Sequence, residues 1–190
     1  MTSTGTALPV LMALRVKGRA AAAAVAAAAG ISEEEARAAI DDACSRGAAG
    51  PSDRTESHSL TDAGRRELAA LLAAEAVDRA ALAALYERFL AADANLKARI
   101  TEWQFLRPER RDGAATAPVR AAGTEALAVV EALQRLVPRL APYARRLGAA
   151  LGAARGNVRF VASPHVDSLH QVWFELHEDL LATLGRTRTP

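Results

Sequence analysis

The sequence predicts a mainly α-helical protein in two parts, a small helical unit with a β-hairpin and then a helical bundle. Apolar residues make up 51% of the 190 residues and aromatic residues only 4%, and alanine, the best helix former, supplies much of the difference. Valine and isoleucine, which a large sheet would need, are few and scattered. We therefore expect residues 1–75 to form one domain and residues 76–190 a helical second domain.

Glycines and a capping residue delimit three helices at the start of the chain. A first helix is expected over residues 8–16 and a second over 19–29, where Gly30 suits the left-handed position that ends a helix. Ser32 then caps a third helix over 32–46, and the glutamate three residues later completes a capping box. A helix, a glycine turn and a serine-capped helix at this spacing are typical of a helix-turn-helix.

A turn and a short strand-like segment follow the third helix. The cluster Gly50–Pro51–Ser52–Asp53 predicts a turn, and the segment SHSL, residues 57–60, is weakly strand-like. The segments on either side of the turn could pair as a small β-hairpin. Thr61 is then expected to cap the next helix.

The segment SLTDAGRREL, residues 59–68, resembles the strand-to-helix junction that closes the wing in winged-helix regulators of the MarR and PadR type. The pair Asp53–Arg54 precedes it, as an Asp-Arg pair precedes the junction in MarR wings. The resemblance covers residues 8–72. The DNA-binding domain comes first and further helices follow it, which is the order found in PadR-like proteins. It implies an N-terminal winged helix-turn-helix with a small β-hairpin wing, followed by a C-terminal helical bundle.

Helical spacing of apolar residues continues into the second part of the chain. A long helix is expected from Leu60 or Thr61 to about residue 106, and it could be interrupted near Ala76–Arg79. Residues 107–123 are polar and contain proline and glycine, so they predict a loop.

Two more helical segments complete the second part. Gly123 or Thr124 is expected to open a helix that Pro138 and Pro142 must kink or split. The final segment, residues 166–185, predicts a strongly amphipathic helix that ends at its glycine. This bundle could serve both as the interface of a homodimer and as an effector pocket.

Two histidines make the last helix the most distinctive part of the sequence. His170 and His177 lie two turns apart, about 10 Å by helical rise, which is too far to bind one metal ion from one helix. One interpretation is a buried seam that carries histidines, and the other is a small-molecule pocket. The residues expected to line such a pocket are Tyr86, Asp93, Trp103, Gln104, His170, Trp173 and His177.

Catalysis is the less favoured interpretation of the same residues. His170 or His177 could act as a general base that Asp93 orients. The sequence has no nucleophile motif of the GxSxG type, no GxGxxG after a strand and no phosphate-binding loop. We therefore expect no cofactor and no metal.

The charge of the third helix bears directly on DNA binding. Residues 32–46 carry five carboxylates and two arginines, whereas phosphate attraction supplies most of the nonspecific affinity for DNA. One hypothesis is nevertheless a ligand-responsive transcription regulator that binds promoter DNA. Its DNA contacts would be Arg19, Ser32, Arg37, Arg54 and Arg65.

The alternative hypothesis is a winged-helix scaffold that does not bind DNA. Its second domain would bind a small molecule, or catalyse a reaction through His170 and His177. The net charge of +2 is well below the basic footprint of most nucleic-acid binders. Cys44 is the single cysteine, which excludes an intramolecular disulfide, and no segment has the length and hydrophobicity of a membrane span, so we expect a soluble, cytoplasmic protein.

Overall fold

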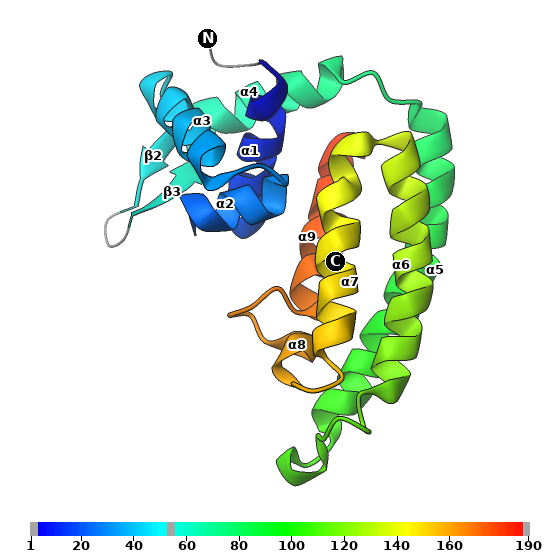
Figure 1. Cartoon of the computed structure of the whole chain (residues 1–190). Coiled ribbons are helices and arrows are strands. Elements are labelled where there is room, and N and C mark those ends of the chain that lie inside the picture. Colours follow the sequence, from blue (N-terminus) through cyan, green and yellow to red (C-terminus); the bar gives the residue numbers. More distant parts are fainter. Residues whose placement is uncertain (1–3, 53–55, 188–190) are drawn as a thin grey trace. The chain divides into compact units, whose positions relative to one another are not determined.

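Helices make up most of the described chain, and a small three-stranded antiparallel sheet accompanies them (Figure 1). The computed structural model describes residues 4–52 and 56–187. The chain divides into two compact units, one formed by Met1–Ala76 together with Glu178–Pro190 and the other by Val77–His177. The last part of the expected second domain therefore groups with the first unit instead.

Four helices build most of the first unit. Helix α1 packs against the other three, and it begins at Thr4, earlier than the expected start at residue 8. The helices are α1 (Thr4–Lys17), α2 (Ala22–Ala29), α3 (Glu33–Ser45) and α4 (Asp62–Ala74). Their shared core includes the buried side chains of Leu11, Leu14, Val25, Ile40 and Leu68.

Local hydrogen bonds end α2 and begin α3 and α4 where the sequence predicts. Gly30 follows α2 with a φ of 73°, in the left-handed region that glycine adopts without strain. The side chain of Ser32 accepts the N–H of Glu35 and the Glu35 carboxylate accepts the N–H of Ser32, which confirms the capping box. Thr61 caps α4 by accepting the N–H of Gly64.

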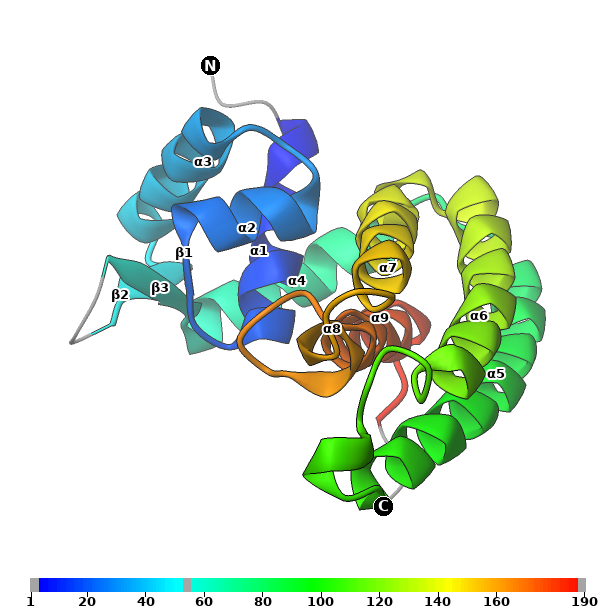
Figure 2. The ribbon, with the colours of Figure 1, turned by 60° about the horizontal axis from the view of Figure 1, so that its bottom comes forward.

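The sheet contains one strand that the sequence does not predict. The strands are β1 (Ala20–Ala21), β2 (Ala49–Pro51) and β3 (Ser57–Leu60), and β3 lies between the other two (Figure 2). Strands β2 and β3 form the expected hairpin, since Gly50 pairs with Ser59, but Gly50 and Pro51 lie in β2 and not in the predicted turn. In β1, Ala20 pairs with His58, so α2 starts three residues later than predicted. Alanine has little preference for strands, and only backbone pairing with β3 makes β1 extended.

Long helices pack against one another in the second unit. Helix α5 packs against α6, and α6 against α7 (Figures 1 and 2). The helices are α5 (Arg79–Phe105), α6 (Ala117–Leu136), α7 (Ala141–Ala153), α8 (Arg159–Ala162) and the part of α9 (Leu169–Leu184) up to His177. The buried face of α5 has helical spacing and includes Leu82, Phe89, Leu96 and Ile100.

Helix boundaries in the second unit differ in part from the predicted ones. Asp78 caps α5 by accepting the N–H of Ala81, so the long predicted helix is interrupted just before it. The predicted loop contains a short 3-10 turn, Pro108–Arg110. Helix α6 begins at Ala117 rather than at residue 123 or 124, because Pro118 suits the first turn of a helix, where its missing N–H costs no hydrogen bond.

Prolines and a glycine define the later boundaries. Pro138 starts a 3-10 turn, Pro138–Leu140, and Pro142 lies in the first turn of α7, so the prolines split the predicted helix instead of kinking it. Helix α9 ends before Gly185, which has a φ of 65° and so occupies the left-handed region, as the sequence predicts.

Candidate functional site

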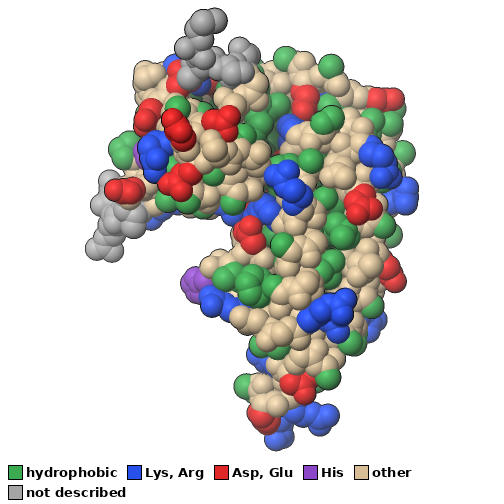
Figure 3. Space-filling view, in the orientation of Figure 1, with side chains coloured by type: hydrophobic (Ala, Val, Ile, Leu, Met, Phe, Trp, Pro, Cys, Tyr) green, Lys and Arg blue, Asp and Glu red, His purple; other side chains and the backbone are tan. Residues whose placement is uncertain are grey.

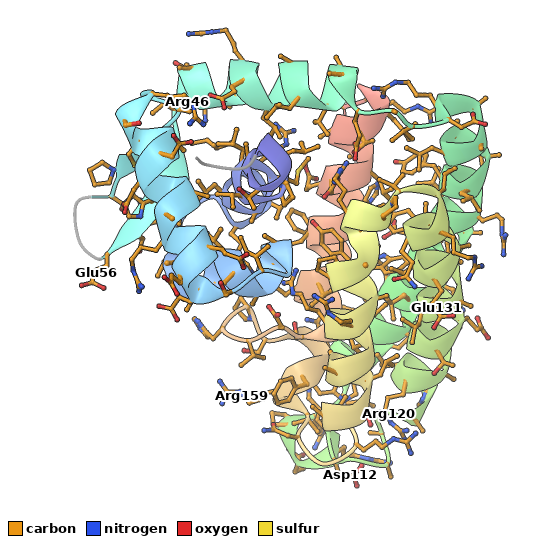
Figure 4. The ribbon with its side chains drawn as sticks, turned by 45° about the horizontal axis from the view of Figure 1, so that its top comes forward. Arg46, Glu56, Asp112, Arg120, Glu131 and Arg159 are labelled. Atoms are coloured by element: carbon orange, nitrogen blue, oxygen red, sulfur yellow. The ribbon has the colours of Figure 1, made fainter. Side chains whose placement is uncertain are left out.

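Both arginines of residues 32–46 form ion pairs with carboxylates of the first unit. Nη2 of Arg37 lies 2.7 Å from Oε1 of Glu33, one turn earlier on α3. Arg46 (labelled in Figure 4) pairs with Asp42 of the same helix and, at 3.0 Å, with Glu67 of α4. Figure 3 shows Asp and Glu side chains gathered over α3. Helix α3 therefore presents a face with net negative charge.

The first turn of α3 adds to this negative charge. The hydroxyl of Ser32 donates to Oε2 of Glu35 at 2.7 Å, so it is engaged within the capping box. The backbone N–H and the hydroxyl of Ser32 lower the pKa of Glu35, which keeps this carboxyl ionised. A DNA-reading helix normally turns this end toward the bases.

The remaining residues predicted to contact DNA differ in their surroundings. Nη2 of Arg65 lies 2.6 Å from Oδ1 of Asp62, and this interaction lowers the pKa of the Asp62 carboxyl. Arg19 is exposed, and within residues 4–52 and 56–187 we find no ion pair for it. Arg54 lies outside the described residues.

A groove of about 520 Å³ lies between the start of α2, helix α3 and strand β3. Three carboxylates and one arginine line it, beside an imidazole and an apolar surface. The lining residues are Ala21, Ala22, Ala23, Glu33, Arg37, Ile40, Asp41, Glu56 and His58.

Four of the seven predicted pocket residues meet in the second unit, between α5 and α9. The hydroxyl of Tyr86 lies 2.9 Å from Nε2 of His177, and Nε1 of Trp173 donates to Oδ1 of Asp93 at 2.8 Å. Phe89 stacks on Trp173 with ring centroids 4.4 Å apart and contacts the His177 ring edge-on. All five side chains are buried. We call these five residues the aromatic cluster.

The aromatic cluster consists of buried side chains that contact one another, and in it Asp93 does not orient His177. Nδ1 of His177 lies 3.9 Å from Oδ1 of Asp93, which is beyond hydrogen-bond distance. The other oxygen of Asp93 accepts Nζ of Lys97 at 2.7 Å. The general-base arrangement expected from the sequence, in which Asp93 orients a histidine, is therefore absent at His177.

The other three predicted pocket residues lie elsewhere, which corrects the expected single pocket. His170 is exposed although its helix buries His177. Trp103 is buried, but it lies about 15 Å along α5 from Asp93. Gln104 is exposed, because one residue of helix turns it about 100° away from the buried face.

His170 has a perturbed imidazole even at its exposed position. Partial burial lowers its pKa, and the ammonium of Lys97 lowers it further, while Asp93 opposes the shift. A lowered pKa keeps His170 neutral at physiological pH.

Sequence reasoning missed a buried ion network around α7. Arg146 is only 8% exposed, and it donates to both oxygens of Asp167, at 2.7 and 2.9 Å. It also donates to Glu175, which is fully buried and accepts from Gln171 as well. Burial alone would lower the pKa of Arg146, but the two carboxylates outweigh it and raise that pKa. The only signal in the sequence is Glu175, an acidic residue among the apolar residues of the last helix.

A second groove, of about 490 Å³, lies between α6 and α7. Its lining contains two arginines, Arg120 and Arg155, and no carboxylate. The other lining residues are small or apolar, apart from a threonine: Ala117, Ala121, Thr124, Leu127, Gly148, Leu151 and Gly152. The sequence did not indicate it, because its residues come from two helices that the structure brings together.

Comparisons of the chain with family models, with curated proteins and with solved structures gave no match. Among the residues that the structure describes, no group of three or more His, Cys, Asp or Glu side chains could hold a metal ion. Within the same residues, no helix is both long and apolar enough to cross a bilayer.

Proposed function

We propose that the protein binds a small molecule and is built on a winged-helix scaffold whose α3 face does not bind DNA. The order of elements in the first unit supports the scaffold. A short strand separates the first two helices, and the hairpin after the third helix pairs with that strand through β3. Helix-turn-helix proteins place the second helix of the motif, here α3, in the major groove.

The pairing of the arginines on and beside α3 is the observation that carries the proposal. Arg37, Arg46 and Arg65 each contact a carboxylate of the first unit, and the groove between α3 and β3 has three carboxylates and one arginine in its lining. Fold alone does not assign function, so we infer from the charge of the α3 face that this face does not bind DNA.

The energetics of DNA binding explain why this face is unsuitable. Most nonspecific affinity comes from cations that displace condensed counterions from phosphates. The ion pair of Arg37 and Glu33 is exposed and worth at most about 1 kcal/mol, so a phosphate could displace the glutamate. The displaced carboxylate would remain beside the phosphate and repel it. The net contribution of the face to DNA binding is therefore unfavourable.

A mobility-shift experiment with the full chain tests the proposal. We expect no retarded complex with a random-sequence duplex pool at about 50 mM salt and about 10 µM protein, even after rounds of selection. A triple variant, Glu33→Gln with Glu34→Gln and Asp41→Asn, should gain a complex that weakens steeply between about 50 and 200 mM salt.

A matched control removes the same number of negative charges from the second unit. The variant Glu109→Gln with Asp112→Asn and Glu131→Gln removes three exposed carboxylates away from α3 and should gain no complex. A salt-sensitive complex of the unmodified protein, or equal gains in both triple variants, would overturn the assignment.

The second candidate is the ligand-responsive, homodimeric transcription regulator, and the exposure of Arg19 favours it. Arg19 directly precedes β1, and no carboxylate is found paired with it in the described part of the chain. A regulator of this kind would lose affinity and salt dependence on Arg19→Ala and on Arg54→Ala. Light scattering at several concentrations would measure whether the chain is a dimer.

A further inference from the structure

We infer that the groove between α6 and α7 binds a small molecule with an apolar body and one anionic end. The anionic end would be a carboxylate, a phosphate or a sulfonate group. The inference rests on the proposed small-molecule function, and it assigns that function a site and a ligand class.

The groove has the size of a ligand site. Its volume of about 490 Å³ lies within the range of about 300–1,000 Å³ that small-molecule pockets occupy. It is open because α7 carries glycine where other helices carry side chains. A Cβ added at Gly152 would meet no atom within 4 Å, and one added at Gly148 would only touch Leu127 at 4.0 Å.

Both arginines lie at the same end of the groove. The turn Pro138–Leu140 joins α6 to α7, so the two helices run antiparallel and the start of α6 lies beside the end of α7. The hydroxyl of Thr116, just before α6, accordingly donates to the carbonyl of Ala154, just after α7, at 3.3 Å. Arg120 and Arg155 therefore lie together, while Leu127 and Gly148 lie toward the other end.

The two guanidinium groups are available to an anion. Nε of Arg120 donates to Thr116, which orients the guanidinium. Within the described residues, neither Arg120 nor Arg155 has an ion pair. Figure 4 shows Arg120 near one end of α6 and Glu131 farther along it, about 16 Å away by helical rise. Two guanidinium groups near one another can hold a carboxylate, phosphate or sulfonate through charge-assisted hydrogen bonds.

The apolar part of the groove accounts for the other end of the ligand. Leu127 and Leu151 provide apolar side chains, and the small residues of both helices let a flat body approach the backbone closely. The helices contact each other at Gly123, where an added Cβ would lie 2.7 Å from Cδ2 of Leu151. This close contact brings α6 and α7 near each other beside the groove, so we expect the groove to favour a flat or extended molecule.

A pair of fluorescent probes tests the inference on the full chain. Anilinonaphthalene sulfonate has a flat apolar body and one anionic group, and phenylnaphthylamine has the same body without the charge. We expect the sulfonate to bind the unmodified protein. The double variant Arg120→Ala with Arg155→Ala should weaken sulfonate binding about ten-fold and change binding of the neutral probe less than about two-fold.

A steric variant and a charge control complete the experiment. Gly152→Leu should weaken both probes about ten-fold or more, because a Cβ at this lining position meets no atom within 4 Å and the longer side chain occupies space in the groove. Arg135→Ala removes an exposed arginine of α6 that lies outside the groove, and it should leave the affinities for both probes unchanged. Circular dichroism and urea unfolding would confirm that each variant is folded.

Three results would overturn the inference. They are no binding of the sulfonate by the unmodified protein, unchanged sulfonate binding in the double arginine variant, and unchanged binding of both probes in Gly152→Leu. None of these results alters the mobility-shift outcome, so a failure of this site is distinguishable from a failure of the claim about α3. Sulfonate binding that persists in all groove variants would place the ligand elsewhere in the protein.

Discussion

At the scale of single residues, the fully buried carboxylate of Glu175 is the most costly group in the second unit. A buried charge loses its hydration, and only its partners offset that loss. Arg146 and Gln171 supply those partners, and Arg146 also donates to both oxygens of Asp167. The network therefore holds α7 and α9 in one register, and its members depend on one another.

This dependence gives a prediction for unfolding in urea. Arg146→Met should lower the free energy of unfolding by about 3 kcal/mol or more, because it leaves the fully buried carboxylate of Glu175 without a cation. The double variant Arg146→Met with Glu175→Leu should be less destabilised than Arg146→Met alone, since the buried carboxylate is removed together with its cation and Asp167 is partly exposed to water. A double variant as unstable as the sum of the two single variants would contradict this account.

His170 gives a prediction about pH. Its pKa is lowered in the folded protein from the ordinary value of 6.5 by partial burial and by Lys97, so the unfolded chain binds the proton more tightly. Stability should therefore fall as the pH drops through 6.5, until His170 is also protonated in the folded state. His170→Gln should lose less stability between about pH 7.5 and 5.5 than the unmodified protein, as measured by unfolding at each pH. Equal losses in the two proteins would contradict the prediction.

At the scale of elements, two glycines in helices provide a matched comparison. A Cβ at Gly64 in α4 would lie 1.9 Å from the carbonyl oxygen of Ala48, whereas one at Gly152 in α7 would lie in open space. Gly64→Ala should therefore destabilise the protein by about 1–3 kcal/mol through overpacking. Gly152→Ala should stabilise it by up to about 1 kcal/mol through helix propensity. Thermal unfolding of both variants checks the opposite signs, and equal shifts would refute the packing argument.

Elements with local end signals were the ones that the sequence predicted well. Ser32, Thr61 and Gly30 act through hydrogen bonds or backbone angles within a few residues, so the limits of α3 and the start of α4 could be predicted. Strand β1 could not, because two alanines become extended only when β3 pairs with them. Helix α6 starts earlier than the sequence predicts, because Pro118 is compatible both with a loop and with the first turn of a helix.

At the scale of the whole molecule, the end of the chain belongs to the first unit. Glu178–Pro190 groups with Met1–Ala76, and Ala182 packs against the core of that unit. A chain that ends at His177 should melt about 5 °C or more below the full chain, because it loses buried side chains that include Leu180. Leu180→Ala should show part of this loss. An unchanged melting temperature would show that the segment does not support the fold.

The candidate sites show which part of function could be predicted. The sequence indicated that Tyr86, Asp93, Trp173 and His177 share buried helix faces, and they meet in the structure. It could not indicate which of them contact each other, namely Tyr86 with His177 and Trp173 with Asp93. Helical spacing tells which residues face inward, but it does not tell how much room the facing helix leaves.

The sequence by itself determined the helical class of the protein, the capped helices of the first unit and the negative charge of α3. These features depend on composition and on interactions within about one helical turn. Tertiary structure alone decided which distant groups meet. Arg146 and Glu175 are separated by 29 positions, and Asp93 and Trp173 by 80. The groove with Arg120 and Arg155 likewise exists only because two antiparallel helices bring small residues face to face. The pattern along one helix fixes the direction of a side chain, and only the packing of helices fixes its partner.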